Sequence, residues 1–207
     1  MKPRSSEPAP YPPPSLLVAG VLLLGLTLSF GVAAATVEDD NKIAVVVRQQ
    51  DDTVHVDVRF RVGVPPPDAW DVLTDFDHLV GVVTSLESSK ILSRSGSSIV
   101  VQQRGRATRG LLSFGFDTTR EVKLKPFEEI RSHLISGTLK MSEGLTRLTS
   151  DGDGTLIVNH GEFIPNIALP PVIGVPFIEA ETRKQFGEMR DEMLRRVRRQ
   201  TMPAVNP

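Results

Sequence analysis

The sequence has no cysteine among its 207 residues. Disulfide bonds, thiolate nucleophiles and cysteine-ligated zinc sites are therefore excluded. Histidine is also scarce, and the spacing of the four residues never matches an HxH or HExxH pattern that would bring two ligands to one metal ion. We expect neither a dedicated metal site nor a bound cofactor. The four histidines are His55, His78, His133 and His160.

The chain also lacks an excess of either charge. Its 24 lysines and arginines nearly balance 25 aspartates and glutamates, for a formal net charge of -1. Nucleic acid binding calls for a clustered positive surface, so we do not expect a nucleic acid partner. A length of 207 residues with 40% hydrophobic residues suits one domain of ordinary size plus some additional sequence.

The first 35 residues have the three-part pattern of a secretory signal peptide. Lys2 and Arg4 form a positive start, residues 16–30 are an uncharged apolar run, and small residues stand at Ala33 and Ala35. This pattern predicts cleavage after Ala35. An uncleaved anchor stays open as the alternative, because the apolar stretch has nearly the roughly 20 residues that a membrane helix needs. Either way we expect residues 36–202 to form an exported domain, periplasmic or otherwise extracytoplasmic.

The exported part begins with patterns typical of strands and then of short helices. From residue 42 to 63 valine alternates with polar residues, which indicates strand structure with one buried face and a turn or bulge at residues 51–52. Prolines at residues 65–67 end this structure and suit the first turn of a helix at residues 66–74, followed by a helical turn at 78–83. Six further strands follow closely enough to pair antiparallel, at residues 90–94, 98–108, 112–125, 130–141, 145–150 and 155–164.

The chain continues with an apolar, proline-rich loop at residues 165–176 and a long helix at residues 177–200. A curved sheet cannot pack flat on one helix along its whole width. We therefore predict an α+β fold in which a curved antiparallel sheet grips the long C-terminal helix and leaves room for a cavity between them. One apolar stripe runs along the helix, at Ile178, Phe186, Met189, Met193 and Val197.

Three segments carry a resemblance to a known family. Residues 64–79 (VPPPDAWDVLTDFDHL) resemble its first helix, where an aromatic side chain enters the core before a short acidic-aromatic turn. Residues 136–140 (SGTLK) are similar to its central strand, and residues 153–156 (DGTL) to the start of its last strand. The family is the START-like, or polyketide cyclase/dehydrase (SRPBCC), superfamily, and within it the coenzyme Q-binding group.

The resemblance covers residues 53–200 and departs at residues 79–84, where the family usually has a proline and an aromatic residue. It implies a helix-grip fold of the START and birch-pollen-allergen kind, with an internal cavity for a lipid, an isoprenoid quinone or a polyketide-like molecule. Such a fold does not fix function, because the family includes carriers as well as aromatic-ring cyclases.

Candidate ligand-binding residues lie on the predicted strand at residues 112–125. Its even positions are the more apolar, so Phe114, Phe116, Thr118 and Arg120 are predicted to face inward. An inward arginine needs a carboxylate, a carbonyl or the polar head of a ligand, because burying an unpaired charge is costly. The alternative is a structural ion pair with an inward acid, or a position near the open end of the sheet.

The last strand and the long helix complete the predicted site. Phe163, Phe186 and Met189 are expected to contribute apolar surface to the cavity. His160 and Glu162 share one face of the last strand, where a histidine beside a carboxylate could move protons. The alternative is that this pair is solvated on the convex side of the sheet, with the intervening residues facing inward.

The leading functional hypothesis is a non-enzymatic carrier or binding protein for a hydrophobic small molecule held in the cavity. The alternative is an aromatase/cyclase or dehydratase-type enzyme that uses His160 with Glu162, or Arg120, in the same cavity. Residues 166–175 have few polar side chains to meet water, so this loop is predicted to pack over the cavity as a lid or to touch a membrane surface. A third hypothesis is an interaction module whose apolar loop docks a partner protein.

Overall fold

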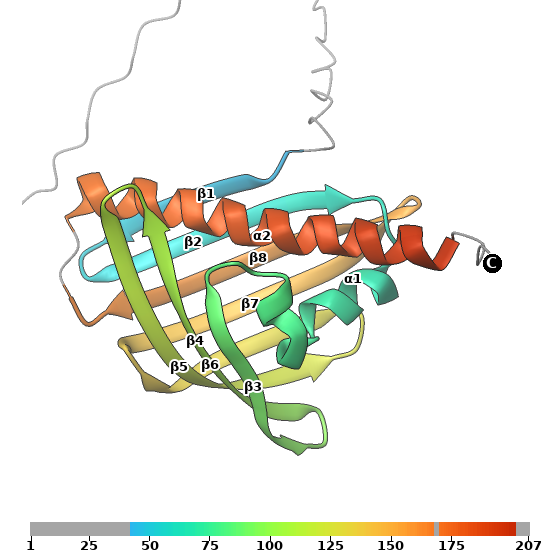
Figure 1. Cartoon of the computed structure of the whole chain (residues 1–207), viewed down its shortest axis with the longest axis horizontal. Coiled ribbons are helices and arrows are strands. Elements are labelled where there is room, and N and C mark those ends of the chain that lie inside the picture. Colours follow the sequence, from blue (N-terminus) through green and yellow to red (C-terminus); the bar gives the residue numbers. More distant parts are fainter. Residues whose placement is uncertain (1–41, 168–169, 202–207) are drawn as a thin grey trace, which may run out of the picture. The chain divides into compact units, whose positions relative to one another are not determined.

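The computed structural model describes residues 42–167 and 170–201 (Figure 1). The predicted signal or anchor segment at residues 1–35 lies outside the described residues. In chain order the elements are β1 (Ala44–Gln50), β2 (Thr53–Val62), α1 (Pro66–Leu73), the 3-10 helix η1 (Phe76–Gly81), β3 (Leu86–Ser95), β4 (Ser98–Arg109), β5 (Leu112–Lys125), β6 (Glu129–Gly137), β7 (Leu139–Asp151), β8 (Gly154–Pro165) and α2 (Pro171–Thr201).

All eight strands form one antiparallel sheet in the order β1-β2-β8-β7-β6-β5-β4-β3. Every neighbouring pair except β2 and β8 is consecutive in the sequence, as short connections between antiparallel strands require. The sheet curves, and α2 runs along its concave side (Figure 1). The predicted α+β helix-grip fold is therefore confirmed.

The core lies where the sheet, α1 and α2 meet. Alternate residues of β2 are buried, from Val54 through Val58 to Val62, while the residues between them face the outer side. From the helix side, Met193 of α2 is fully buried in the same cluster. Trp70 anchors α1 there and makes an edge contact with Phe127, with ring centroids 5.9 Å apart.

An ion-pair network fastens α2 to the start of η1. Arg196 donates from Nη2 to Asp75 Oδ2 at 2.7 Å and from Nε to Glu192 Oε1 at 2.8 Å. Burial alone would raise the pKa of Asp75, but hydrogen bonds from His78 and Arg196 outweigh it and lower that pKa below its usual value. The hydrogen bond from Arg195 does the same for the pKa of Glu192, against an opposing effect of burial.

Several predicted boundaries differ from the structure, among them that of the helical turn predicted at residues 78–83, which is η1 at Phe76–Gly81. The strand predicted at residues 90–94 is β3 and begins earlier, at Leu86. The helix predicted at residues 177–200 begins earlier too, at Pro171, so the predicted loop at residues 165–176 shortens to the segment before that proline. A proline fits the first helical turn because its missing N–H has no partner there, and Gly174 N donates to Pro170 O at 2.8 Å to close that turn. Within the described residues, no helix is long and apolar enough to cross a membrane.

The strands predicted at residues 130–141 and 145–150 are wrong in their division, because β6 ends at Gly137 and β7 runs unbroken from Leu139 to Asp151. Gly137 has a φ of 144°, and a Cβ there would lie 2.2 Å from the carbonyl oxygen of Asp117 on β5. Only glycine permits this close approach of two backbones. Thr138 holds the crossing in place, because its backbone N donates to the same carbonyl oxygen at 2.8 Å.

Candidate functional site

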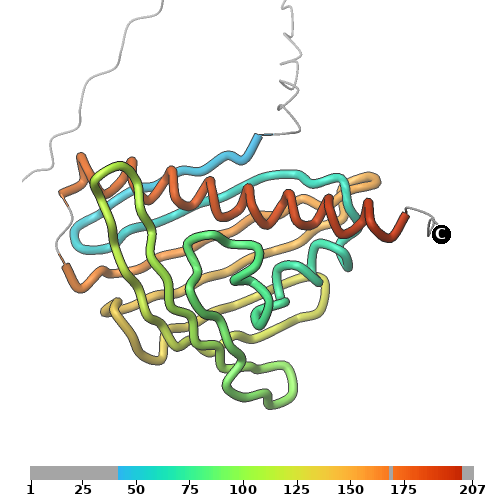
Figure 2. Tube along the Cα trace, in the orientation of Figure 1, coloured from blue at the N-terminus to red at the C-terminus, as the bar shows by residue number. Residues whose placement is uncertain are grey.

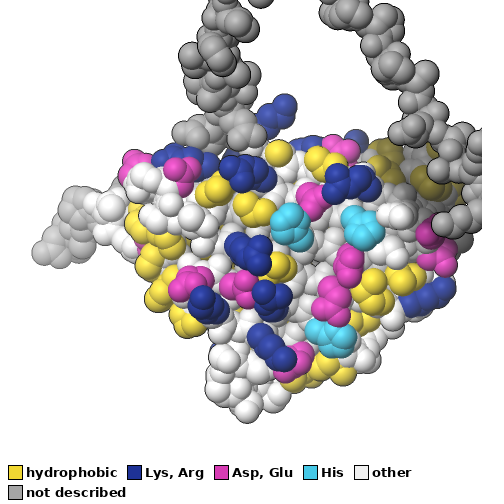
Figure 3. Space-filling view, turned by 180° about the vertical axis from the view of Figure 1, so that it is seen from behind, with side chains coloured by type: hydrophobic (Ala, Val, Ile, Leu, Met, Phe, Trp, Pro, Cys, Tyr) yellow, Lys and Arg dark blue, Asp and Glu magenta, His cyan; other side chains and the backbone are white. Residues whose placement is uncertain are grey.

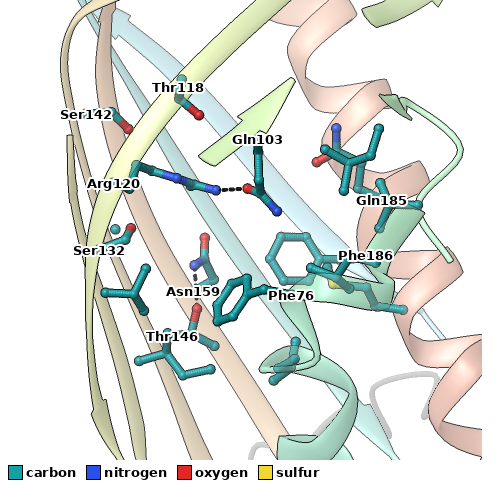
Figure 4. A pocket seen from close by; sticks show the side chains of 18 of the residues that line it. Phe76, Gln103, Thr118, Arg120, Ser132, Ser142, Thr146, Asn159, Gln185 and Phe186 are labelled. Atoms are coloured by element: carbon teal, nitrogen blue, oxygen red, sulfur yellow. Dashed lines mark hydrogen bonds between the residues drawn. The ribbon is translucent and has the colours of Figure 1, made fainter. Parts of the chain in front are cut away.

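A hollow of about 330 Å³ lies between the concave face of the sheet and the helices (Figure 4). We call it the inner cavity. Its helix side is apolar except for Gln185 of α2, because the amphipathic helices turn mainly hydrophobic residues toward the sheet. The apolar residues that form this side are Leu73 of α1, Phe76 and Leu79 of η1, Val83, and Phe186 and Met189 of α2.

The sheet side of the inner cavity is largely polar. Side chains from five neighbouring strands, β4 to β8, present hydroxyl, amide and guanidinium groups to the hollow. Several of them bond to one another, as Asn159 Nδ2 does to Thr146 Oγ1 at 2.8 Å. The cavity therefore has one apolar and one hydrogen-bonding wall. The polar residues are Gln103, Thr118, Arg120, Ser132, Ser142, Thr146 and Asn159.

Arg120 is the charged group of this wall. It extends from β5 across the cavity and donates a hydrogen bond from Nη2 to the side-chain oxygen of Gln103 (Figure 4). Gln103 is itself held by Ser89, to which its Nε2 donates at 3.1 Å. Arg120 Nε is buried and has no hydrogen-bond partner, and no ion pair among the described residues includes this arginine. The alternative, in which Arg120 forms an ion pair with an inward acid, is therefore wrong for the described residues.

Burial lowers the pKa of the Arg120 guanidinium from its usual value. A guanidinium nevertheless keeps its charge in proteins, so the cavity holds a cation with unused donor capacity. An unsatisfied buried donor of this kind costs stability unless another group completes it. The group that fits is an oxygen acceptor, and an anionic oxygen fits best.

A second hollow, of about 630 Å³, lies next to the inner cavity, by the β4–β5 hairpin and the start of α2. We call it the mouth. Phe116, Leu139 and Gln185 line both hollows and form the partition between them. The mouth is mainly apolar, and Phe114 and Phe177 close one side of it with an edge contact at 4.9 Å between ring centroids. The two hollows thus adjoin, and we call the pair the path; its inner end carries the polar wall and its outer end is mainly apolar.

The predicted ligand-binding residues divide between the two hollows. The inner cavity is lined by Phe116, Thr118, Arg120, Phe186 and Met189. Phe114 and Phe163 instead line the mouth, together with Phe116. All seven therefore face the path between sheet and helices, and a role for each of them in binding stays a prediction.

His160 and Glu162 do not face either hollow, so the hypothesis of an acid-base pair in the same cavity as Arg120 is wrong in its geometry. Ile157 of β8 is buried and Asn159 lines the inner cavity, which turns the alternate residues to the outer face. On that face His160 Nδ1 lies 2.6 Å from Asp57 Oδ1.

The outer face around His160 is a shallow depression with charged side chains. His55 Nδ1 lies 3.6 Å from Glu162 Oε2, and His133 is hydrogen-bonded to Glu143. Histidine side chains lie among acidic and basic ones across this face (Figure 3). This is the solvated arrangement weighed as the alternative for His160 and Glu162. Within the described part of the chain, no three histidine, aspartate or glutamate residues converge on a metal site.

Sequence reasoning missed most of the polar wall. Ser132, Ser142 and Thr146 were not singled out, because single serines and threonines in strands are usually solvated. The available signal was the inward phase of each strand. The sequence assigns that phase for β5. It does not assign it for β6 and β7, because the local pattern does not reveal that β6 ends at Gly137.

Comparison with known proteins places the chain among proteins of similar architecture. A sequence model for the family described as "Polyketide cyclase / dehydrase and lipid transport" matches residues 53–201. A search of curated proteins found no match.

Several solved structures share the fold. The Zhui aromatase/cyclase from Streptomyces sp. R1128 aligns with a TM-score of 0.62 and 19% identity over 73% of this chain and 99% of that one. A STAR-related lipid transfer protein from Xanthomonas axonopodis gives a TM-score of 0.58 and 11% identity over 73% and 98%. A START superfamily protein from Mycobacterium smegmatis gives 0.54 and 16% over 71% and 99%. At these identities the likeness concerns the fold alone.

Proposed function

Because the chain belongs to the polyketide cyclase / dehydrase and lipid transport family, we propose that it is a non-enzymatic carrier for an amphiphilic small molecule with a hydrophobic body. The family supports a hydrophobic ligand or cyclase-type chemistry, and the finer choice rests on the inner cavity. The observation that carries it is the composition of this cavity. Among the described residues whose side chains line it, Arg120 alone is ionisable.

A carrier accounts for this composition better than an enzyme does. General acid-base catalysis needs a group that exchanges protons near neutral pH, such as histidine or a carboxyl group of raised pKa. In the part of the chain that the structure describes, no histidine, carboxyl, lysine, tyrosine or cysteine side chain lines the inner cavity. A guanidinium binds an oxygen acceptor but is a poor proton donor or acceptor. Of the residues predicted for the aromatase/cyclase alternative, Arg120 is therefore the one that lies in the inner cavity.

The ligand class follows from the two walls. An apolar body gains by leaving water for the helix wall and the mouth, at about 25 cal/mol for each Å² buried. A carboxylate, phosphate, enolate or carbonyl oxygen at the inner end would complete Arg120. Lipids, isoprenoid quinones and polyketide-like molecules all combine an apolar body with such oxygens. The coenzyme Q-binding resemblance remains one prediction within this class.

A pair of fluorescent probes tests the proposal directly. N-phenyl-1-naphthylamine is neutral, and 8-anilinonaphthalene-1-sulfonate is the same arylamine with an added sulfonate. We expect the protein to bind both, and the Arg120→Met variant to lose about tenfold or more in affinity for the sulfonate only, because a hydrogen bond to a charged group contributes roughly 1.5–3 kcal/mol.

The matched control is His160→Ala, which changes the outer face and should leave the binding of both probes within about twofold. If the wild-type protein binds neither probe, and native mass spectrometry of protein from its own host repeatedly shows an empty chain, the carrier proposal fails. If turnover of a bound molecule is found and is lost in Arg120→Met while binding persists, the enzyme alternative replaces it.

We further propose that the carrier acts outside the cytoplasm. The support is the sequence pattern of residues 1–35, with a positive start, an apolar run and small residues at Ala33 and Ala35. The intact mass of the chain isolated from its host tests this. A chain that begins at Thr36 supports signal cleavage, a full-length chain in the membrane fraction supports an anchor, and a full-length chain in the cytosol refutes export.

A further inference from the structure

Two apolar tips flank the mouth and project into solvent. One is the β4–β5 hairpin, where Leu111 is fully exposed and Leu112 partly exposed. The other is the connection from β8 to α2, where Val172 is 86% exposed and Ile167 and Ile173 are also exposed. We call these five residues the mouth tips. Large apolar side chains in water carry no benefit for the isolated protein, so a cluster of them indicates a contact surface.

The two tips lie side by side. Arg109 at the end of β4 donates from Nη1 to the carbonyl oxygen of Pro176 in α2 at 3.4 Å. Between β5 and α2, the rings of Phe114 and Phe177 make an edge contact, and both rings line the mouth. The backbone trace shows the β4–β5 turn reaching the first turns of α2 (Figure 2). The exposed side chains therefore lie beside the mouth, and Ile167 also lines it.

Charged side chains are few around the mouth tips, although Glu181 lines the mouth itself. Arg109 is the one charged residue at positions 108–113, and positions 166–178 contain none. The next charged side chain along α2, Glu179, is paired with Arg183 at 2.6 Å. Apolar side chains enter the boundary between headgroups and acyl chains, and a neighbouring cation is attracted to anionic headgroups.

The available area is small for a protein partner. The five mouth tips each bury up to roughly 100 Å² when covered, so that together they offer at most about 500 Å². A stable protein interface buries about 800 Å² on each partner. A bilayer needs no matching surface, because lipids rearrange around each inserted side chain. We propose that the mouth tips insert into a lipid bilayer and set the mouth directly against it.

The test uses the full chain, because the fluorescence of a tryptophan at position 111 reports on insertion at that position alone. The Leu111→Trp variant should show a blue-shifted emission with vesicles of phosphatidylcholine and phosphatidylglycerol, and quenching when the acyl chains carry bromine. The matched control is Leu92→Trp, at a position 54% exposed on β3, in the hairpin at the lower edge of Figure 1. It should show neither effect. Emission from the buried Trp70 is subtracted with the unsubstituted chain.

Two further variants sharpen the result. Val172→Asn in the Leu111→Trp background should reduce quenching, because it replaces an apolar contact on the second tip. Arg109→Gln should lower the preference for anionic over neutral vesicles by about fivefold, the effect expected for one cation near the surface.

Absent quenching of Leu111→Trp, or equal quenching of Leu92→Trp, overturns the proposal. A blue shift that appears on concentrating Leu111→Trp without lipid also overturns it, since a second copy of the chain would then cover the tips. Binding of N-phenyl-1-naphthylamine is unaffected by either failure, which separates this proposal from carriage itself.

Discussion

Replacing Arg120 by methionine should cost the empty protein almost nothing in stability. Two effects oppose one another. Replacing buried ionic groups by hydrophobic ones of similar volume is often neutral or stabilising, by about 1–4 kcal/mol for an ion pair, and a lone buried charge carries the same desolvation penalty without a partner to offset it. The side-chain oxygen of Gln103 loses its donor, which costs about 1–3 kcal/mol. We expect the free energy of unfolding to change by no more than about 1 kcal/mol.

The comparison is Arg196→Met, because Arg196 is a paired arginine of the same chain. It joins Asp75 and Glu192, whose side chains are 24% and 9% exposed. Breaking a fully buried pair costs about 3–5 kcal/mol. Partial exposure weakens the interaction, so we expect a loss of about 2 kcal/mol for this variant.

Urea unfolding of delipidated protein, followed by far-ultraviolet circular dichroism, measures both values. With 8-anilinonaphthalene-1-sulfonate at about one hundred times its dissociation constant, the wild-type protein should gain about 2.7 kcal/mol, and Arg120→Met clearly less at the same probe concentration. A loss of about 3 kcal/mol in empty Arg120→Met would refute the reasoning, because Arg120 would then be a structural group rather than one kept at a cost for a ligand.

Three other outcomes follow from the geometry. Ser142→Trp should fill much of the inner cavity of about 330 Å³ and weaken N-phenyl-1-naphthylamine binding by at least about tenfold in fluorescence titration, while the circular dichroism spectrum is kept. Gly137→Ala should lower the free energy of unfolding in urea by about 3 kcal/mol or more, because its Cβ would lie 2.2 Å from a backbone oxygen. As a control, Gly63→Ala should change this free energy by less than about 1 kcal/mol, because a Cβ there has no heavy atom within 4 Å. Asp75 and Glu192 have pKa values in the folded state that are lowered from their usual values, so their stabilising effect is complete above the usual carboxyl pKa values and is lost as the pH falls through the lower folded ones. Thermal melts between pH 7 and 3 should show this loss, and an unchanged melting temperature would contradict it.

The architecture was largely readable from the sequence because its elements have strong local periods. The alternation of valine in β2 and the apolar stripe of α2 each identify a buried face without any long-range information. The same alternation in β5 predicted Arg120 as an inward cation. The break between β6 and β7 at Gly137 was the hardest boundary to predict. It depends on the close approach of Gly137 to the backbone of Asp117 on a neighbouring strand, which a local pattern does not reveal.

The site was less predictable because it depends on which residues meet across strands. Gln103 becomes the partner of Arg120 only through the register of β4 and β5, where Gln103 is opposite Thr118. The phase of β8 was undetermined by sequence, since both faces of that strand contain apolar residues. The pairing with β2 decides it, because His160 stands opposite the outward Asp57 and not a buried valine.

The partition formed by Phe116, Leu139 and Gln185 separates a polar end from an apolar end, and this polarity gives a guest a preferred direction. An amphiphile in the path would lie with its oxygens innermost and its hydrocarbon toward the opening. Loading would then proceed head-first and unloading tail-first, so that the hydrocarbon reaches the acceptor before the last bond to Arg120 breaks. The hydrocarbon part of the ligand would thus not be exposed to water during release.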